Sequence, residues 1–307
     1  MPRIVILDTA PALTGLDLSG LEALGNVTIY EHTDLDMIKA RIVDANIIVT
    51  NKCRITAEHL LSATSLQGIS VLATGTDNID LDAARNARID VRNVAGYSTA
   101  STAQLAVGLL IAAAHNIVDN ASDVARGGWQ QRAIWSYSLR PMLELCHATI
   151  GIIGYGSIGK AIAAPLVALG ANVVPIALPG REKPGHTPIA DVLPRADAVI
   201  LQCPLTPQTR GLVDSAFINA MKTGAILVNT ARGPVVDPSA ICQGLDSGKL
   251  SVYAADVLET EPPSAAHPLT SHPKAIITPH VAWSTEASRR RLLAATVENV
   301  RAMLTEQ

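Results

Sequence analysis

Short apolar runs alternate with helical segments over the first 97 residues. Residues 35–44 and 57–65 are predicted helices, and the predicted strands are Ile4–Leu7, Val27–Tyr30, Ile47–Thr50 and Gly68–Ala73. Strands that are separated by helices of this length indicate a parallel sheet. Three of these strands end in polar or glycine-containing loops, at residues 8–9, 51–52 and 74–77. Because ligands of open α/β sheets bind beyond the strand ends, these loops are candidate binding segments.

The same alternation resumes at Thr149 and predicts a second parallel sheet. Its strands are expected at Thr149–Ile153, Asn172–Ile176, Ala198–Gln202, Ala225–Asn229, Tyr253–Asp256 and Ala275–Thr278. Residues 284–303 have apolar positions at helical spacing and are predicted to pack back on the first unit. The predicted fold class is therefore α/β, with two doubly wound parallel-sheet domains. Residues 1–97 and 284–307 would form one domain, and residues 98–283 the other.

The segment between the two units contains no charged residue from Asn93 to Val118. A membrane span would need about 20 continuous apolar residues, but the continuous apolar part is only Leu105–Ala114. We therefore expect a buried helix at a domain junction or subunit interface. Residues 126–144 follow with little apolar periodicity and with two of the three tryptophans, Trp129 and Trp135, and are expected to be an irregular excursion.

Composition narrows the class further. The 307 residues are 48% hydrophobic but only 3% aromatic, so that the core must consist of Ala, Val, Leu and Ile. The net charge is −3 with acids and bases interspersed, and this disfavours nucleic-acid binding. The four cysteines have no metal-ligand spacing, so we expect free thiols and no metal site. Since the amino terminus reads as a strand rather than a signal peptide, a soluble, cytoplasmic protein is expected.

A glycine-rich motif in the second unit predicts dinucleotide binding. Strand Thr149–Ile153 leads into Gly154-Tyr-Gly156-Ser157-Ile158-Gly159 and then into a helical run. The first glycine of such a motif permits the tight turn, the second admits the pyrophosphate, and the third lets helix and strand pack closely. The helix amino terminus then attracts the phosphates. A ligand-free glycine-rich turn is the alternative, which the strand before and the helix after disfavour.

The end of the following strand leaves the choice of cofactor open. NAD-specific sites usually place an acidic residue there for the ribose hydroxyls, but this position falls near Ala177. Arg181 follows and could meet the 2′-phosphate of NADP. Either NAD or NADP is therefore expected. Pro165 lies within the helix after the glycine motif, where it removes a hydrogen bond and is expected to kink the helix.

Three later segments carry catalytic chemistry, each at a predicted strand end. Arg232, Glu261 and His280 occur in Asn-Thr-Ala-Arg-Gly, Glu-Pro-Pro and Thr-Pro-His, respectively. A ketone reduction needs a proton donor at the carbonyl oxygen, and histidine serves near neutral pH. A carboxylate hydrogen-bonded to the imidazole holds its tautomer, and arginine grips a carboxylate bidentately. Each residue alone has an ordinary structural interpretation, as a surface charge, a loop residue or a helix start; together they indicate hydride transfer to a 2-keto acid.

With these motifs, the chain resembles the D-isomer-specific 2-hydroxyacid dehydrogenases, and within them the hydroxypyruvate reductase/glycerate dehydrogenase branch. The resemblance extends over nearly the whole chain and rests on ordered motifs at residues 73–80, 93–99, 154–159, 203–206, 229–233, 261–263 and 278–283. It implies a flavodoxin-like substrate domain and a Rossmann cofactor domain with a cleft between them. It also implies NAD(P)-dependent reduction of a small 2-keto acid such as hydroxypyruvate or glyoxylate.

The resemblance assigns roles to individual residues. Arg232 would orient the keto acid, His280 would be the acid/base, and Glu261 would be its partner. Thr74, Gly75 and Thr76 would take the substrate carboxylate, and Asp256 would hold the nicotinamide carboxamide. Trp135 of a homodimer partner and Trp283 are implied near the substrate. The cofactor would be lined by Thr102, Gly154, Gly156, Ser157, Ile158, Gly159, Ala177, Arg181, Cys203, Pro204, Thr209, Thr230 and Ala231.

Departures from the family pattern leave alternatives open. Ala177 stands where an acid is usual, and Thr102 and Gln104 stand where Val and Glu are common. Some members of the family resemble NAD(H)-sensing corepressors that need no turnover, so a binding protein of this kind is the alternative function. The presence of all three predicted catalytic residues, Arg232, Glu261 and His280, favours an enzyme over such a binding protein. Formate dehydrogenases of the superfamily have Gln in place of Glu261, which disfavours that activity.

Overall fold

A computed structural model describes residues 1–181 and 183–305 of the chain. These residues form two compact units, the first of residues 1–98 with 283–305 and the second of the described residues between 99 and 282. Each unit contains one sheet, and every strand pair in both sheets is parallel. Two parallel-sheet α/β domains, as the strand and helix pattern predicts, are therefore confirmed.

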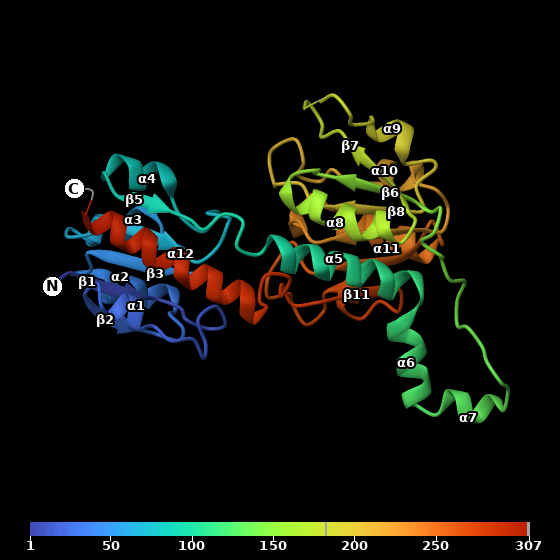
Figure 1. Cartoon of the computed structure of the whole chain (residues 1–307), viewed down its shortest axis with the longest axis horizontal. Helices are drawn as coiled ribbons and strands as arrows, with labels where there is room; N and C mark the ends of the chain where they lie inside the picture. Colours follow the sequence, from blue (N-terminus) through green and yellow to red (C-terminus); the bar gives the residue numbers. More distant parts are fainter. Residues whose placement is uncertain (182, 306–307) are drawn as a thin grey trace. The chain divides into compact units, whose positions relative to one another are not determined.

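The first unit has a five-stranded sheet in the order β2-β1-β3-β4-β5, the flavodoxin-like order. The strands are β1 (Arg3–Ile6), β2 (Asn26–Ile29), β3 (Ile47–Thr50), β4 (Gly68–Val71) and β5 (Asp90–Arg92) (Figure 1). The sequence pattern predicts the first four. It misses β5 because Asp90-Val91-Arg92 has no apolar run, and the strand is recruited by pairing with β4.

Alternation along the strands supplies the apolar surface for helices on both faces of this sheet. Ile4 and Ile6 of β1 pack with α1 (Ser19–Glu22) and α12 (Glu286–Thr305). Val5 points to the opposite face and packs with α2 (Ile38–Ile42), α3 (Ala57–Ser62) and α4 (Leu81–Asn86). A short 3₁₀ helix, η1 (Leu35–Met37), precedes α2. The carboxy-terminal helix α12 therefore completes the core of the first unit, where Leu292, Val300 and Met303 are buried.

The second unit has a six-stranded sheet in the order β11-β10-β9-β8-β6-β7. Its strands are β6 (Thr149–Ile153), β7 (Asn172–Ile176), β8 (Ala198–Leu201), β9 (Ala225–Asn229), β10 (Leu250–Ala255) and β11 (Ala275–Ile277). Thr187 adds a parallel bridge to Ile176, beyond β7. If Thr187 is counted as a one-residue third strand, the order becomes that of a Rossmann sheet, with its switch point between β6 and β8.

Helices cover both faces of this second sheet. α5 (Thr99–Ala114) and α8 (Ser157–Ala168) pack on one face. On the other face lie α9 (Ile189–Val192), α10 (Ser215–Ala220) and α11 (Pro238–Asp246). The uncharged segment thus forms a core helix, α5, as predicted, with Ala106 and Leu110 fully buried. Pro165 lies inside α8, which continues to Ala168.

No single described helix is long and apolar enough to cross a membrane. α5 and α6 (Ile117–Ala125) together reach the length and composition, but the chain bends by 62° between them.

A helical arm projects from the second unit after α5. It consists of α6 and α7 (Gly128–Arg132), followed by an extended return (Figure 1). The prediction of an irregular segment at 126–144 therefore misses one short helix. Asp123 organises the arm, because its carboxylate accepts hydrogen bonds from Tyr137 Oη and Arg132 Nη1, both at 2.7 Å. Trp129 Nε1 donates to the carbonyl oxygen of Ile134 at 3.0 Å.

Candidate active site

The turn from β6 to α8 has the geometry that a dinucleotide requires. Gly154 adopts φ +97°, and a Cβ there would lie 2.4 Å from the carbonyl oxygen of Gln202. A Cβ on Gly159 would lie 2.5 Å from the carbonyl oxygen of Gly154. At Gly156, in contrast, a Cβ would meet no described heavy atom within 4 Å. The first and third glycines thus serve close packing, while the second leaves open space beside the backbone, where a pyrophosphate fits.

The amino terminus of α8 adds the electrostatic part of this site. Gly156 is the N-cap residue, and within the described chain no side chain caps this end of the twelve-residue helix. The first N–H groups of a helix lack intrahelical partners and carry the positive end of the helix dipole. This end lies at the switch point between β6 and β8, so that it can bind the phosphates of a nucleotide cofactor.

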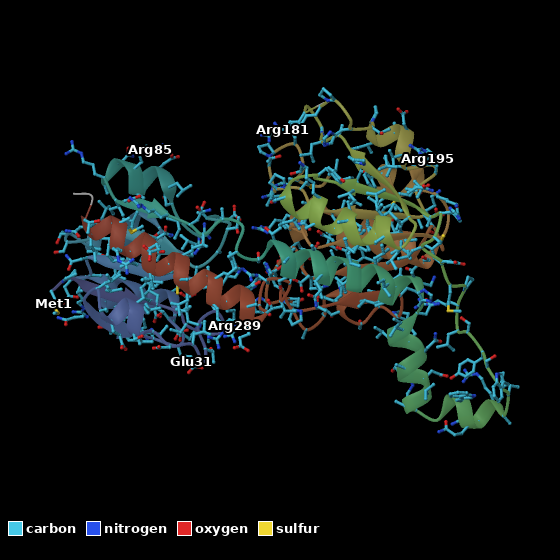
Figure 2. All side chains as sticks on the ribbon, in the orientation of Figure 1. Met1, Glu31, Arg85, Arg181, Arg195 and Arg289 are labelled. Carbon is cyan, nitrogen blue, oxygen red and sulfur yellow. The ribbon has the colours of Figure 1, made fainter. Side chains whose placement is uncertain are left out.

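A pocket of about 210 Å³ opens beside this turn. Its wall includes Gly154, Gly156 and Gln202 and, from the loop after β7, the basic side chains Arg181, Lys183 and His186. Figure 2 shows Arg181 in this loop of the second unit. His186 also packs edge-on against the Tyr155 ring, at 6.1 Å between ring centroids. Among the described residues that line the pocket none is acidic.

At the end of β7 stands Ala177, whose side chain has no polar group that could bind a ribose. Ala177 is buried, and its N–H donates to the carbonyl oxygen of Thr187 at 2.9 Å. Thr187 N–H in turn donates to the carbonyl oxygen of Pro175 at 2.9 Å. These two bonds belong to the parallel bridge between Thr187 and β7, and the loop before this bridge presents Arg181, Lys183 and His186 to the pocket.

Arg232 stands in a turn that Asn229 shapes. The Asn229 side chain accepts a hydrogen bond from Ala231 N–H at 3.0 Å and donates to the carbonyl oxygen of Arg232 at 3.2 Å. Asn229 is fully buried at the end of β9, whereas Arg232 is half-buried. Arg232 Nη1 donates to the carbonyl oxygen of Ala231 at 2.8 Å. The turn therefore holds the guanidinium stem at the carboxyl end of the sheet.

Glu261 and His280 form a direct pair. Glu261 Oε2 lies 2.6 Å from His280 Nδ1, and Glu261 Oε1 accepts a hydrogen bond from Leu258 N–H at 3.0 Å. Both carboxylate oxygens thus have partners. His280 adopts φ +53°, which is uncommon for a residue with a side chain and points to a constrained position. With Nδ1–H donated to Glu261, Nε2 is the imidazole nitrogen left to exchange a proton with a ligand.

Asp256 fixes the backbone around His280. Its Oδ1 accepts from Thr278 Oγ1 at 2.6 Å and from Val281 N–H at 2.9 Å, and its Oδ2 accepts from Ala282 N–H at 2.8 Å. His280 N–H donates to the Asp256 carbonyl oxygen at 2.9 Å. Asp256 is 1% exposed, so this buried carboxylate is compensated by its donors. Its predicted contact with a nicotinamide stays a prediction.

The segments that carry Arg232 and Glu261 are in backbone contact. A Cβ on Gly233 would lie 1.9 Å from the carbonyl carbon of Leu258 and 2.3 Å from the Glu259 nitrogen. Gly233 is therefore required by close approach. Through this contact, the Arg232 turn lies against the loop that holds Glu261, and Glu261 in turn contacts His280. The structure thus gathers all three predicted residues at the carboxyl ends of β9, β10 and β11.

The other predicted residues lie at several places. Cys203 is buried after β8, and burial raises the pKa of its thiol to about 11, so that it is neutral near pH 7. Thr230 Oγ1 donates to Gln202 Oε1 at 2.6 Å, and Thr209 Oγ1 donates to the Pro204 carbonyl oxygen at 2.6 Å. Ser157 and Ile158 begin α8. Thr102 and Ala231 are buried in the second unit.

The remaining residues that the sequence predicts to contact the substrate lie in the first unit and in the arm. Thr74 donates from Oγ1 to the carbonyl oxygen of Val94 at 3.0 Å, and the loop with Gly75 and Thr76 follows β4 in the first unit. Trp283 is buried in the core of that unit, whereas Trp135 of the arm is 92% exposed. The sequence motifs give no role to Asn229, Lys183, His186 or Gln202. Asn229 belongs to the Asn-Thr-Ala-Arg-Gly motif, so this motif is a signal for its role in the turn. Lys183, His186 and Gln202 belong to no sequence motif that would indicate a pocket.

Comparisons with known proteins place the chain in a family. The model of the D-isomer specific 2-hydroxyacid dehydrogenase NAD binding domain matches residues 107–282. A hydroxypyruvate reductase of Blautia hydrogenotrophica is 35% identical, over 98% of this chain and 97% of that protein. A glycerate dehydrogenase of Methylorubrum extorquens is 36% identical, over 90% of this chain and 88% of that protein. A crystal structure of a Thermus thermophilus protein aligns with a TM-score of 0.89 at 34% identity, covering 99% of this chain and 97% of that one.

The chain belongs to the D-isomer specific 2-hydroxyacid dehydrogenase family. It is therefore an NAD(P)-dependent oxidoreductase, and its second unit contains the NAD-binding domain of the family. Its similarity to a hydroxypyruvate reductase and a glycerate dehydrogenase confirms the branch that the sequence motifs indicate.

The three glycines of the β6–α8 turn give a matched pair of substitutions. Gly156→Ala adds a methyl group in open space, so that we expect stability to change by no more than about 0.5 kcal/mol while NADH or NADPH binding weakens. Gly159→Ala forces its Cβ against Gly154, so that we expect a loss of about 1–3 kcal/mol of stability. Denaturant unfolding and cofactor fluorescence titration measure both effects. Full cofactor affinity in Gly156→Ala would contradict this assignment.

Proposed function

We propose that this protein reduces a small 2-keto acid, such as hydroxypyruvate or glyoxylate, to the corresponding D-2-hydroxy acid. The observation that carries the proposal is the contact of 2.6 Å between His280 Nδ1 and Glu261 Oε2. It fixes one imidazole tautomer and leaves Nε2 for proton transfer. We assign substrate binding to the first unit and cofactor binding to the second.

The proposed chemistry divides between the cofactor and the side chains. The reduced nicotinamide, when bound at the β6–α8 turn, would supply the hydride for C2 of the keto acid. His280 Nε2 donates a proton to the carbonyl oxygen, and Glu261 stabilises the imidazolium before this transfer. Arg232 binds the keto acid and polarises its carbonyl group. In the reverse direction, His280 takes the hydroxyl proton, so the same pair serves as acid and as base.

The residues around this centre receive supporting roles. The loop of Thr74, Gly75 and Thr76 would bind the substrate carboxylate through backbone N–H groups, and Trp283 would border the substrate. Asp256, whose Oδ2 faces Ala282 N–H, would also accept from the nicotinamide carboxamide. The cofactor would contact Thr102, Ser157, Ile158, Cys203, Pro204, Thr209, Thr230 and Ala231. The four free cysteines support a reducing compartment, the cytoplasm.

Replacement of the proton donor tests the reaction. His280→Gln keeps a polar side chain but removes the acid, so we expect the kcat for keto-acid reduction to fall by about 10²–10⁴-fold. Cofactor affinity should stay unchanged. Turnover is measured with hydroxypyruvate, glyoxylate, pyruvate and phenylpyruvate.

Two outcomes would contradict the proposal. Near-normal turnover in His280→Gln would exclude His280 as the acid/base. Failure of the wild-type protein to reduce any 2-keto acid, combined with NADH-dependent binding of peptide partners, would instead support a corepressor-like sensor.

We further propose that NADPH is the preferred cofactor. Three basic side chains, Arg181, Lys183 and His186, border the pocket where the adenosine ribose would lie, and Ala177 provides no carboxylate for the ribose hydroxyls. A 2′-phosphate carries negative charge, which this environment attracts, whereas NADH offers no such group.

Charge removal in the loop after β7 tests this preference. In Arg181→Ala we expect the KM for NADPH to rise about 10-fold, the value of one lost charge-assisted contact, while the KM for NADH changes little. Arg195→Ala, in the exposed turn that follows α9, is the control for a general loss of positive charge. Equal effects of Arg181→Ala on both cofactors would contradict the proposal.

We also propose a homodimer in which the arm of one subunit reaches the substrate site of the other. Exposed apolar side chains occur on this projecting arm, with Trp129, Ile134 and Met142 each about half exposed or more and Trp135 almost fully exposed. Such exposed apolar surface favours burial against a partner. The internal bonds of Asp123 and Trp129 give the arm a defined shape for this contact.

Trp135→Ala tests the role of the arm. If Trp135 borders the partner's substrate, its removal should change the KM for a bulky keto acid such as phenylpyruvate by a different factor than the KM for glyoxylate. The variant should remain a dimer. Steady-state kinetics and sedimentation equilibrium measure the two properties. A monomeric wild-type protein would contradict this part of the proposal. So would KM values of Trp135→Ala that equal those of the wild type for both keto acids.

A further inference from the structure

A second histidine–carboxylate pair lies beside the first. His267 Nε2 is 2.8 Å from Glu259 Oε1, and the His267 side chain is 5% exposed while that of Glu259 is 33% exposed. Glu259 stands two residues before Glu261, in the loop that follows β10. The proposed chemistry of the site needs only one such pair. A buried, hydrogen-bonded imidazole in the same loop therefore requires a separate explanation.

The surroundings of His267 define its tautomer. Its Nδ1 accepts a hydrogen bond from Leu269 N–H at 3.3 Å, at the start of the 3₁₀ helix η3 (Pro268–Thr270). Nδ1 is thus the acceptor, so Nε2 carries the hydrogen and donates it to Glu259. The imidazole thereby joins the short helix η3 to the loop that carries Glu261.

The backbone near Glu259 is held from two sides. Leu258 and Glu259 lie directly on Gly233, where a Cβ would be 2.3 Å from the Glu259 nitrogen. Leu258 N–H donates to Glu261 Oε1. A movement of Glu259 therefore changes both the support of the Glu261 carboxylate and the contact with the turn after Arg232. The side chain of Glu259 is the part of this loop that His267 anchors.

A buried tyrosine also supports the Arg232 turn. Tyr253 of β10 is fully buried, and its hydroxyl accepts a hydrogen bond of 3.4 Å from Asn229 Nδ2. Asn229 shapes the turn of Arg232. Burial raises the pKa of Tyr253, so that its hydroxyl stays neutral. The link from Glu259 to this turn is the close backbone contact with Gly233.

We propose that Glu259 and His267 are a positioning pair, which holds Glu261 in the orientation that fixes His280. This inference rests on the proposed function, because it assigns the pair an effect on proton transfer. Neither side chain contacts the reacting atoms. Their action passes through the backbone of residues 258–261 to the Glu261 carboxylate, and from there to the imidazole of His280.

The key variant is His267→Asn. Asparagine retains a side-chain oxygen that can accept from Leu269 N–H, but it is too short to reach Glu259. We expect kcat to fall by about 10- to 100-fold, because small displacements of catalytic groups cost rates of this size. The KM for the nicotinamide cofactor should stay unchanged. Glu259→Ala should give the same split, and Glu259→Gln, which keeps an acceptor for His267, should restore most of the activity.

His272 provides a matched control in the same unit. Its Nδ1 accepts from Lys274 N–H at 3.1 Å, and its Nε2 lies 3.3 Å from Asp246 Oδ1, so it repeats the arrangement of His267. It precedes β11, however, whereas His280 follows this strand. His272→Asn should therefore remove the same kinds of contact, with a smaller loss of stability because the Asp246 side chain is 76% exposed, and leave kcat unchanged. If both variants lost kcat equally, the effect of His267→Asn would be explained by general destabilisation. That result would overturn the proposal.

A double-mutant cycle with Glu261→Gln separates positioning from packing. If His267 acts through Glu261, His267→Asn should lower kcat little further in a Glu261→Gln background. Full additivity of the two substitutions, or wild-type kcat in His267→Asn, would overturn the inference while leaving the proposed function intact. A wild-type protein that reduces no 2-keto acid would instead refute the proposed function, before any variant is compared.

Discussion

The buried carboxylate of Asp256 is the constraint on which the candidate active site depends. An ionised carboxylate removed from water is stable only when donors compensate it. Thr278, Val281 and Ala282 supply these donors, and all three belong to the segment that surrounds His280. This satisfied charge therefore holds the end of β10 to the residues after β11. Because the segment is fixed at both sides of His280, the backbone can keep that residue at a positive φ.

Close backbone packing extends this constraint across the sheet. Gly233 allows the loop after β10 to lie on the turn after β9, and Gly154 allows the β6–α8 turn to lie on the end of β8. Neither contact leaves room for a side chain. The ends of β9, β10 and β11, and likewise those of β6 and β8, are thus joined by polar and steric contacts rather than by apolar packing. This arrangement is suited to catalysis, since loops held by several independent contacts preserve the geometry of their side chains.

Much of this arrangement could be predicted because it depends on local patterns. The apolar runs located β6, β8 and β9, and the glycine spacing located the start of α8. Glu261 and His280 are 19 residues apart, yet their positions at neighbouring strand ends predicted their proximity. Other features depend on tertiary context. The strand Asp90–Arg92 forms only because β4 offers it hydrogen bonds, and the bridge at Thr187 involves a single residue. The buried state of His267 likewise follows from packing that its sequence neighbours do not reveal.

The bridge at Thr187 also has a structural consequence. Rossmann sheets usually continue here with a full strand, whose residues would be committed to pairing and core packing. In this protein two backbone hydrogen bonds, Ala177 to Thr187 and Thr187 to Pro175, form a one-residue parallel bridge at the sheet edge. The loop before Thr187 borders the nucleotide pocket, whereas neither of these two bonds involves the turns that hold Arg232 and His280. The segments proposed to select the nucleotide and the keto acid are thus held in place by separate sets of contacts.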